Sequence, residues 1–294
     1  MNAALGAQNA SNGVSVRLRR ARMVRGALVF LAMLAVAFLM ALPILYTLAT
    51  ALKPNAFVLE FPPRLIPQNP TLDNFVEAWT SNSFGLYFLN SLQVAVFSTV
   101  GTVLIACSGA YAFARVRFPG RELAFRLYLV FLMIPGILYI IPQFLLAKNL
   151  HLLNSLGGLV IYYIAGNIAF HTFLLKGFFE GIPVEIEEAA QIDGASRWQV
   201  FYRIALPLAA PAVGTSAIFA FLASWDEFTL ALTFLNDQAM RTLPIAIRLF
   251  QGQHTSRWGL VFAAALIALV PVLIVYTIFQ GAFIRTVDSG GLKG

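Results

Sequence analysis

Uncharged apolar stretches alternate with short polar segments along the whole chain. Residues 26–52 contain no charged residue. Because about 20 apolar residues are enough to cross a bilayer as a helix, this stretch predicts a first transmembrane helix at 27–52. Five further apolar stretches predict the remaining spans at about 90–114, 124–147, 156–177, 207–234 and 259–284. The pattern therefore predicts an all-α polytopic membrane protein with six transmembrane helices.

Two local sequence features modify this simple pattern. Pro135 and Gly136 lie inside the third predicted span and are expected to interrupt it, because proline removes a backbone donor and glycine weakens a helix. Thr71 and Asp73 stand before an amphipathic stretch, so either residue is a candidate N-cap of a short surface helix.

Composition supports the bilayer as the main solvent of this chain. Of its 294 residues, 59% are hydrophobic and only 11% are charged, whereas soluble domains carry roughly a quarter charged residues. The basic flank before residue 26 is also a feature of signal peptides, but the apolar run is too long and no small-residue cleavage site closes it. The net charge of +7 is therefore read as a determinant of membrane topology, and nucleic acid is not an expected partner.

The distribution of basic residues predicts the orientation. We expect residues 1–25 to form an N-terminal tail whose first 16 residues are disordered, 26–285 to form the transmembrane domain, and 286–294 to form a C-terminal tail. Most Lys and Arg residues fall in the two tails and in alternate loops, including the loop at 180–206. Because cytoplasmic loops carry the excess of Lys and Arg, both termini and this central loop are predicted to be cytoplasmic.

The central loop is the most polar part of the second half of the chain. Five acids lie between Glu180 and Asp193. Good helix formers precede Gly194, and a second helical stretch follows it. A helix–glycine–helix element of this kind is expected to lie outside the bilayer, offering apolar and acidic side chains to a partner.

The spacing within this loop is specific. Glu188-Ala189-Ala190 is followed by three residues, then Gly194, then nine residues, then Ile204-x-Leu206-Pro207. This pattern resembles the EAA loop of ATP-binding-cassette (ABC) importer permeases. The resemblance implies a type I ABC importer permease fold with a cytoplasmic EAA coupling helix. It also implies that the residues of the loop that contact or position the ATPase are Glu187, Glu188, Ala189, Ala190, Asp193, Gly194, Ala195, Ile204, Leu206 and Pro207.

Four other segments resemble the sugar permeases of this family, of the maltose and trehalose type. They are TLDNF at 71–75, AYAFARVRFPGR at 110–121, SWDEF at 224–228 and SGGLKG at 289–294. The resemblance implies a permease subunit of an ATP-driven, binding-protein-dependent importer for a sugar, with a di- or oligosaccharide expected. It implies as partners a second homologous permease, two ATPase subunits and an extracytoplasmic sugar-binding protein, in the bacterial cytoplasmic (inner) membrane.

The chain lacks the motifs of an enzyme. It contains no GxxxxGK[ST] phosphate-binding loop, no HExxH and no GxSxG, so it is expected to have no catalytic residue and no cofactor of its own. ATP and Mg²⁺ would be bound by the partner ATPase subunits. His151, His171 and His254 show no metal-ligand spacing, and Cys107 lies in an apolar run typical of core packing. We expect His171 to be satisfied by a backbone carbonyl.

A candidate substrate path lies in the fifth predicted span, at Trp225, Asp226 and Glu227. Acids inside a membrane are costly and usually functional, and an indole ring can stack on a sugar face. The alternative is an interfacial aromatic residue with acids at the outer surface. Residues 236–258 predict an outer loop, and by resemblance Arg248, Gln251, Gly252 and Gln253 would contact the binding protein.

Other functions stay open on the sequence. A proton-coupled secondary transporter could use Asp226 and Glu227 as its relay, but it leaves the central loop unexplained. A glycerol-phosphate or polyol ABC permease would carry closely similar motifs. A third class is a membrane-anchored scaffold or receptor. A protein of this class would need no polar cavity, and the broken third span argues against this class.

Overall fold

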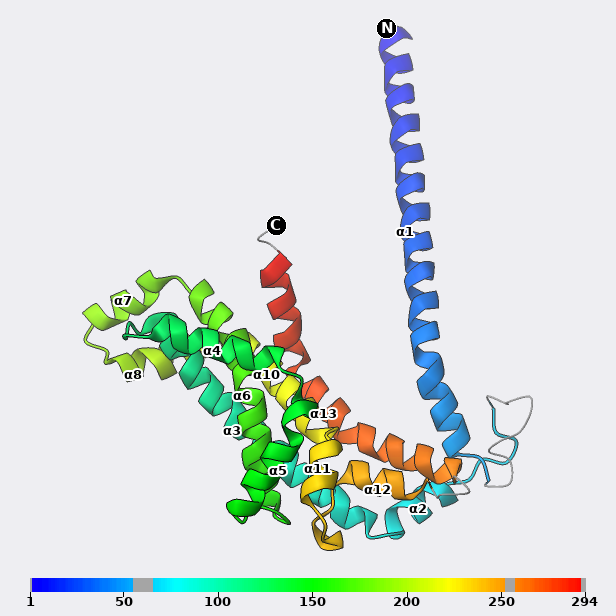
Figure 1. Cartoon of the computed structure of the whole chain (residues 1–294). Coiled ribbons are helices and arrows are strands. Elements are labelled where there is room, and N and C mark those ends of the chain that lie inside the picture. The colour runs from blue at the N-terminus through cyan, green and yellow to red at the C-terminus, as the bar shows by residue number, and fades with distance from the viewer. Residues whose placement is uncertain (1, 55–65, 252–256, 292–294) are drawn as a thin grey trace.

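The computed structural model describes residues 2–54, 66–251 and 257–291. Within these ranges the chain is helical and contains no β-strand (Figure 1). Four helices are long and apolar enough to cross a membrane, and two sharply bent helix pairs raise the number of candidate spans to as many as six. The predicted all-α polytopic class is confirmed.

The first helix, α1, extends from Asn2 to Ala51. The expectation of a disordered start is wrong, because helix begins at Asn2. Alanine and leucine near the start are good helix formers, and the span that follows supplies the costly nucleus. Along 23–51, α1 projects away from the other helices and meets them only near its C-terminal end, against α13 (Figure 1).

A short helix and a long helix follow. Helix α2 spans Asp73–Thr80, and the Thr71 hydroxyl accepts a hydrogen bond from the Asp73 N–H at 3.1 Å. Helix α3 spans Phe84–Arg115, so it starts earlier than the predicted boundary at residue 90. It contains no proline, and it packs most extensively against α6 and then α10.

The third predicted span is broken as expected. Helix α4 (Arg121–Met133) and the segment formed by the 3₁₀ turn η2 (Gly136–Tyr139) and α5 (Ile140–Asn149) meet at 96°. Helix α6 (Leu156–Gly181) returns through the bundle. Its N-cap is Ser155, whose hydroxyl accepts a hydrogen bond from the Gly158 N–H at 3.2 Å.

The central loop and the fifth predicted span form a series of short helices. In order these are α7 (Val184–Ile192), α8 (Arg197–Val200), the π-helical turn η3 (Phe201–Ala205), α9 (Leu206–Leu208), α10 (Ala210–Trp225) and α11 (Thr229–Phe234). The segment predicted as a span at 207–234 is therefore not one continuous helix. Helix α10 ends at Trp225, and a bend of 76° separates it from the segment ending at Leu208.

The last part of the chain also departs from a simple loop and span. The 3₁₀ turn η4 (Gln238–Met240) and helix α12 (Leu243–Leu249) occupy the predicted outer loop. Leu243, Ile245 and Ala246 are buried, so much of this segment packs on the bundle. Helix α13 (Trp258–Gly291) completes the fold.

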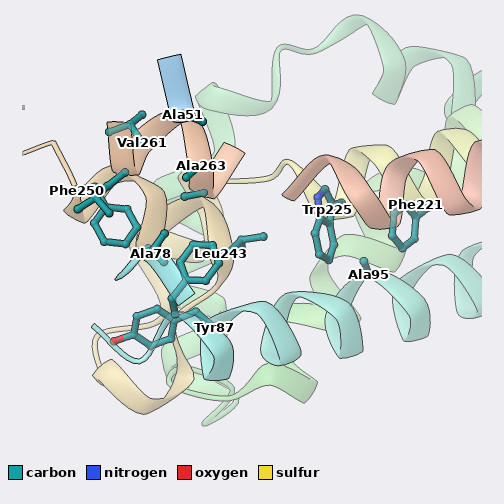
Figure 2. Close-up of a cluster of buried hydrophobic side chains, with 14 residues drawn as sticks. Ala51, Ala78, Tyr87, Ala95, Phe221, Trp225, Leu243, Phe250, Val261 and Ala263 are labelled. Atoms are coloured by element: carbon teal, nitrogen blue, oxygen red, sulfur yellow. The ribbon is translucent and has the colours of Figure 1, made fainter. Parts of the chain in front are cut away.

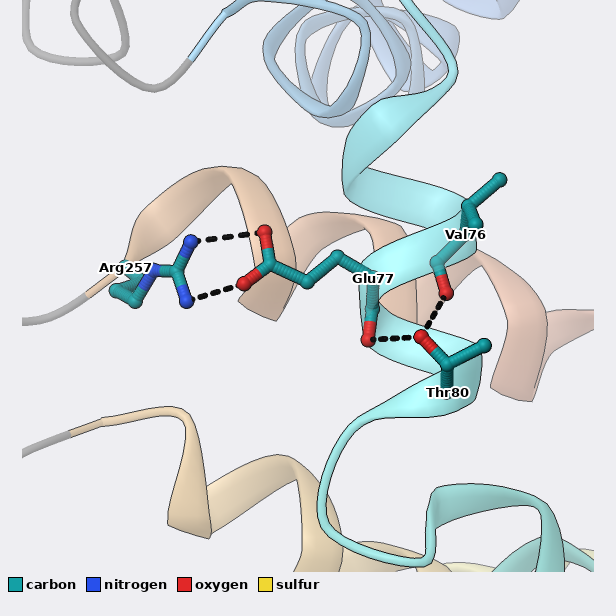
Figure 3. A network of polar contacts seen from close by, with 4 residues as sticks. All are labelled: Val76, Glu77, Thr80 and Arg257. Carbon is teal, nitrogen blue, oxygen red and sulfur yellow. Dashed lines mark hydrogen bonds and ion pairs between the residues drawn. The ribbon is translucent and has the colours of Figure 1, made fainter.

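A buried apolar cluster and an ion pair hold together the end of the bundle that contains α2 and α12. Side chains from α1, α2, α3, α10, α12 and α13 form one buried apolar cluster, with Tyr87, Leu243 and Phe250 at one end and Phe221 and Trp225 at the other (Figure 2). Beside it, Arg257 donates two hydrogen bonds to the carboxylate of Glu77, at 2.5 and 2.8 Å (Figure 3). This paired geometry fixes the start of α13 against α2.

Two buried polar residues within the bundle also have defined environments. His171 on α6 lies 2.8 Å from the Ser216 hydroxyl on α10 through Nδ1, so its partner is a side chain, and the expected backbone carbonyl partner is wrong. Cys107 is a free, buried thiol that belongs to an apolar cluster with buried residues of α3, α6, η3 and α10, as expected.

Candidate functional site

The central loop forms a bent element at one end of the bundle. Helix α7 ends near Asp193, and Gly194 follows with a φ of +90°, a conformation that side chains with a Cβ rarely adopt. Ser196 then begins α8 with a capping box, because its hydroxyl accepts from the Gln199 N–H and its own N–H donates to the Gln199 side chain at 2.8 Å. Gly194 therefore makes the turn, and Ser196 restarts the helix.

Most of this element is exposed. Ile192 is 86% exposed and Trp198 71% exposed, and Glu188, Ala189 and Asp193 are exposed as well. Ala190, Ala195, Ile204 and Leu206 are half-buried, whereas Pro207 is exposed. Exposed apolar side chains beside acids are the composition expected of a docking surface.

Glu187 is the exception. It is the only buried residue of α7, at 3% exposure. Its carboxylate accepts hydrogen bonds from Arg115 Nε at 2.8 Å and from the Tyr111 hydroxyl at 2.9 Å, both on α3. Arg115 also donates to the carbonyl oxygen of Ile182 at 2.6 Å. In this structure Glu187 therefore faces the bundle and binds α3, while its neighbour Glu188 faces outward.

A second candidate region lies at the opposite end of the bundle. A cavity of about 310 Å³ is lined by Trp225, Asp226, Phe228, Leu243, Pro244, Ile247, Arg248, Gln251 and Ala268. Four residues singled out from the sequence thus meet here: Trp225, Asp226, Arg248 and Gln251. Arg248 donates to the Gln251 side-chain oxygen at 2.8 Å. Gly252 and Gln253, the other predicted loop residues, lie outside the described residues.

The indole of Trp225 is committed to the core. The side chain is 2% exposed, stacks on Phe221, and meets Phe88 edge to face. Its Nε1 donates to the carbonyl oxygen of Ala268 at 3.1 Å. The expectation that Trp225 offers its ring face to a sugar is therefore not met, and the ring instead forms part of the cavity wall.

Glu227 is also occupied. Its carboxylate accepts hydrogen bonds from the N–H groups of Leu230 and Ala231, at 2.7 and 3.0 Å, and from the Tyr163 hydroxyl at 2.6 Å. It therefore caps α11 and ties this helix to α6. Of the two adjacent acids, only Asp226 is exposed toward the cavity.

Several contact residues were missed by the sequence reading. Arg115 and Tyr111 hold Glu187, and Tyr163 holds Glu227. Asn90 and Ser91 on α3 bind the backbone of η4 and of the start of α12. Arg115 could have been singled out from the sequence, because it is the charged residue that ends the apolar run of α3. The others lie within apolar or mixed helices whose partners are remote in sequence.

No cluster of metal-ligating side chains occurs among the residues that the structure describes.

Residues 108–289 match the family described as "Binding-protein-dependent transport system inner membrane component". The chain belongs to this family. The matched range contains the EAA-like element and the residues that line the cavity near Asp226 and Arg248. Permeases of this family work with a second permease and with ATPase subunits, so the chain is a transport subunit of an ABC importer and is not itself an enzyme.

Curated relatives cover most of this permease. The sulfoquinovosyl glycerol transport permease SmoH of Agrobacterium fabrum is 38% identical over 252 residues, covering 86% of this chain and 88% of that protein. The diacetylchitobiose uptake permease NgcG of Streptomyces coelicolor is 35% identical, covering 85% and 83%. The trehalose transport permease SugB of Mycobacterium tuberculosis is 33% identical, covering 86% and 92%.

A solved structure supports the fold. A chain of a bacterial ABC transporter involved in the import of the acidic polysaccharide alginate superposes with a TM-score of 0.74. The match covers 90% of this permease and 98% of that chain, at 24% sequence identity. The permease fold expected from the sequence is therefore confirmed.

Proposed function

We propose that this permease imports a sugar of di- or oligosaccharide size and that the element at 184–207 couples it to the ATPase subunits. The observation that carries the coupling assignment is the division of α7 into two faces. Glu187 is bound to α3, while Glu188 and the exposed apolar residues are available to a partner. A helix fixed on one side and open on the other has the arrangement that transmission of movement from a partner requires.

In the proposed mechanism, ATP binding brings the ATPase subunits together. The exposed face of α7 and α8 moves with them, and the ion pair of Glu187 carries this displacement into α3. The spans then change from inward-facing to outward-facing, the binding protein releases its sugar into the cavity near Asp226 and Arg248, and ATP hydrolysis resets the assembly.

The orientation we propose has both termini and the 184–207 element in the cytoplasm. The N-terminal end of α1, the C-terminal end of α13 and α7 all extend toward the same side of the molecule, whereas α2 and α12 lie at the other (Figure 1). This arrangement agrees with the excess of basic residues in the segments assigned to the cytoplasm. In this proposed orientation, the cavity near Asp226 and Arg248 would face the binding protein.

The proposed substrate class rests on the relatives, whose names specify sulfoquinovosyl glycerol, diacetylchitobiose and trehalose. The cavity of about 310 Å³ is at the lower end of the range of roughly 300–1,000 Å³ typical of small-molecule sites. Asp226 and Arg248 supply an acceptor and donors of the kind that sugar hydroxyls bind.

Copurification of the tagged chain from native membranes tests the assignment. We expect a second permease of similar size and an ATPase to accompany it, and the ligand carried by the associated binding protein to identify the sugar. A chain that is recovered alone, and that transports in ATP-containing vesicles only while a proton gradient persists, would contradict the proposal and favour a proton-coupled transporter.

The coupling role of the exposed acid has a matched control on the same helix. Glu188→Ala should reduce uptake of the identified sugar, whereas Glu185→Ala, which removes another exposed acid of α7, should stay near the unmodified level. Equal uptake by both variants would remove the specific role of Glu188.

A further inference from the structure

Helix α7 is held to the bundle in an unusual way. Its only buried side chain is a carboxylate, and that carboxylate binds two residues of one helix, Tyr111 and Arg115 of α3. Most apolar residues of α7 are exposed, Ile192 above all, and Ala190 is half-buried. Because apolar packing does not fasten α7, displacement of this helix is transmitted mainly through the Glu187 contacts.

The other end of α3 holds the outer segment in a similar way. Asn90 donates through Nδ2 to the carbonyl oxygens of Ala239 and Arg241, both at 2.9 Å. The Ser91 hydroxyl accepts from the Leu243 N–H at 2.7 Å. Two consecutive residues of α3 thus hold η4 and the start of α12, and α12 supplies Leu243, Ile247 and Arg248 to the outer cavity.

These two sets of contacts are separated by most of one helix. Residues 90–115 of α3 extend roughly 38 Å at 1.5 Å per residue, and no proline interrupts them. Figure 1 shows α7 and α12 at opposite ends of the bundle that α3 crosses. The helix is also bound along its length by α6 and α10, so it moves with the bundle and bends little.

We propose that α3 is the mechanical link between the 184–207 element and the outer cavity, with Arg115 as the positioning residue at one end and Asn90 at the other. This inference rests on the proposed coupling function and specifies its route. A shift of α7 pulls on Arg115, α3 moves with it, and Asn90 and Ser91 carry η4 and α12 along. The cavity wall formed by α12 then changes its exposure when nucleotide is bound on the far side.

The test follows the accessibility of the cavity in the purified importer complex. An Ile247→Cys substitution places a thiol in the cavity lining, and the native Cys107 is buried. The rate of its reaction with a membrane-impermeant maleimide is compared in the nucleotide-free complex and in the complex trapped with Mg²⁺, ATP and vanadate. We expect the two rates to differ by about tenfold, which lies within the range typical of coupled sites.

Variants at both ends of α3 then locate the link. Arg115→Gln and Asn90→Leu should each make the labelling rate independent of nucleotide, while the ATPase still copurifies and hydrolyses ATP. Arg121→Gln is the matched control, because among the described residues the Arg121 side chain pairs with its exposed neighbour Glu122, and this variant should keep the nucleotide-dependent difference. Reversal of the pair, with Arg115→Glu and Glu187→Arg together, should restore part of the difference, which a variant that merely misfolds would not do.

The outcomes separate this inference from the proposed function. If no ATPase accompanies the unmodified chain, the coupling function fails and the inference falls with it. If an active ATPase is present, labelling that is insensitive to nucleotide in the unmodified complex overturns the link alone. A nucleotide-dependent difference in labelling rate that remains in the Arg115→Gln variant also overturns the proposed link through α3.

Discussion

Tyr163 donates a hydrogen bond to Glu227 over 2.6 Å and so joins the N-terminal half of α6 to the start of α11. The same carboxylate caps α11 by accepting from the N–H groups of Leu230 and Ala231. Glu227, which the sequence offered as a candidate for substrate binding or proton transfer, thus has a structural role in linking two helices. The polar side chains that line the nearby cavity are those of Asp226, Arg248 and Gln251.

Glu227→Gln should lower stability. The amide can accept at its oxygen only, so at least one of the three donors loses its partner, at a cost of about 1–3 kcal/mol for each. Thermal unfolding of the detergent-purified chain measures this effect, and Asp226→Asn, which disrupts no bond within the described chain, should unfold near the unmodified temperature. If Glu227→Gln abolished transport at unchanged stability, a relay role for Glu227 would be supported instead.

Gly194→Pro should uncouple ATP hydrolysis from transport. Proline fixes φ near −65°, whereas this position needs +90°, so the turn between α7 and α8 cannot form. Gly194→Ala should have a smaller effect, about 1–2 kcal/mol of local strain, since no atom within 4 Å would obstruct its Cβ. The ratio of ATP hydrolysed to sugar imported in proteoliposomes measures both effects.

Gly177→Ala is the matched control for this pair. Gly177 lies inside α6 with no atom within 4 Å of an added Cβ, and alanine is the better helix former by about 1 kcal/mol. Its coupling ratio should equal that of the unmodified chain. An unchanged ratio in Gly194→Pro as well would show that the bend is not needed for coupling.

Gly158→Ala should strongly destabilise the start of α6. A Cβ at this position would lie 2.2 Å from the carbonyl oxygen of Leu152, and because that atom is backbone, the turn before α6 must shift. Gly166→Ala, in the same helix with open space around it, should be tolerated. We expect the first variant alone to show reduced expression and a lower unfolding temperature, and equal behaviour of the two would argue against this close approach.

Asn74→Asp should loosen the junction of α1 with α2. Asn74 donates to the carbonyl oxygens of Ala51 and Lys53, at 2.8 and 2.7 Å, and a carboxylate would place an acceptor against both oxygens. Leaving buried groups unpaired costs about 1–3 kcal/mol, and more for a charged group.

Gly259→Ala should reproduce part of the same effect without changing charge. Its Cβ would lie 2.9 Å from the Asn74 amide and would displace that side chain. Protease accessibility of the α1–α2 connection measures both variants. Gly85→Ala serves as the control, because its Cβ would make only ordinary contact with Trp79, at 3.6 Å, and cleavage as rapid in this control would contradict the assignment.

The sequence predicted the helical class, the number of candidate spans, the break at Pro135 and Gly136 and the family. These features follow from apolar runs long enough for a bilayer, from proline and glycine chemistry, and from the fixed spacing in the central loop. The boundaries of α3 and the split at Asp226 were not predicted. An apolar run does not show where a side-chain cap, such as Glu227, ends one helix and starts the next.

Only the tertiary structure decided the role of each polar residue. Glu187 and Glu188 are adjacent and chemically identical, but successive residues of a helix point about 100° apart, so one is buried against Arg115 and the other is exposed. The sequence determined that two acids stand at the start of an EAA-like loop. Which acid holds the bundle depends on where α3, 72 residues earlier in the chain, places its terminal arginine.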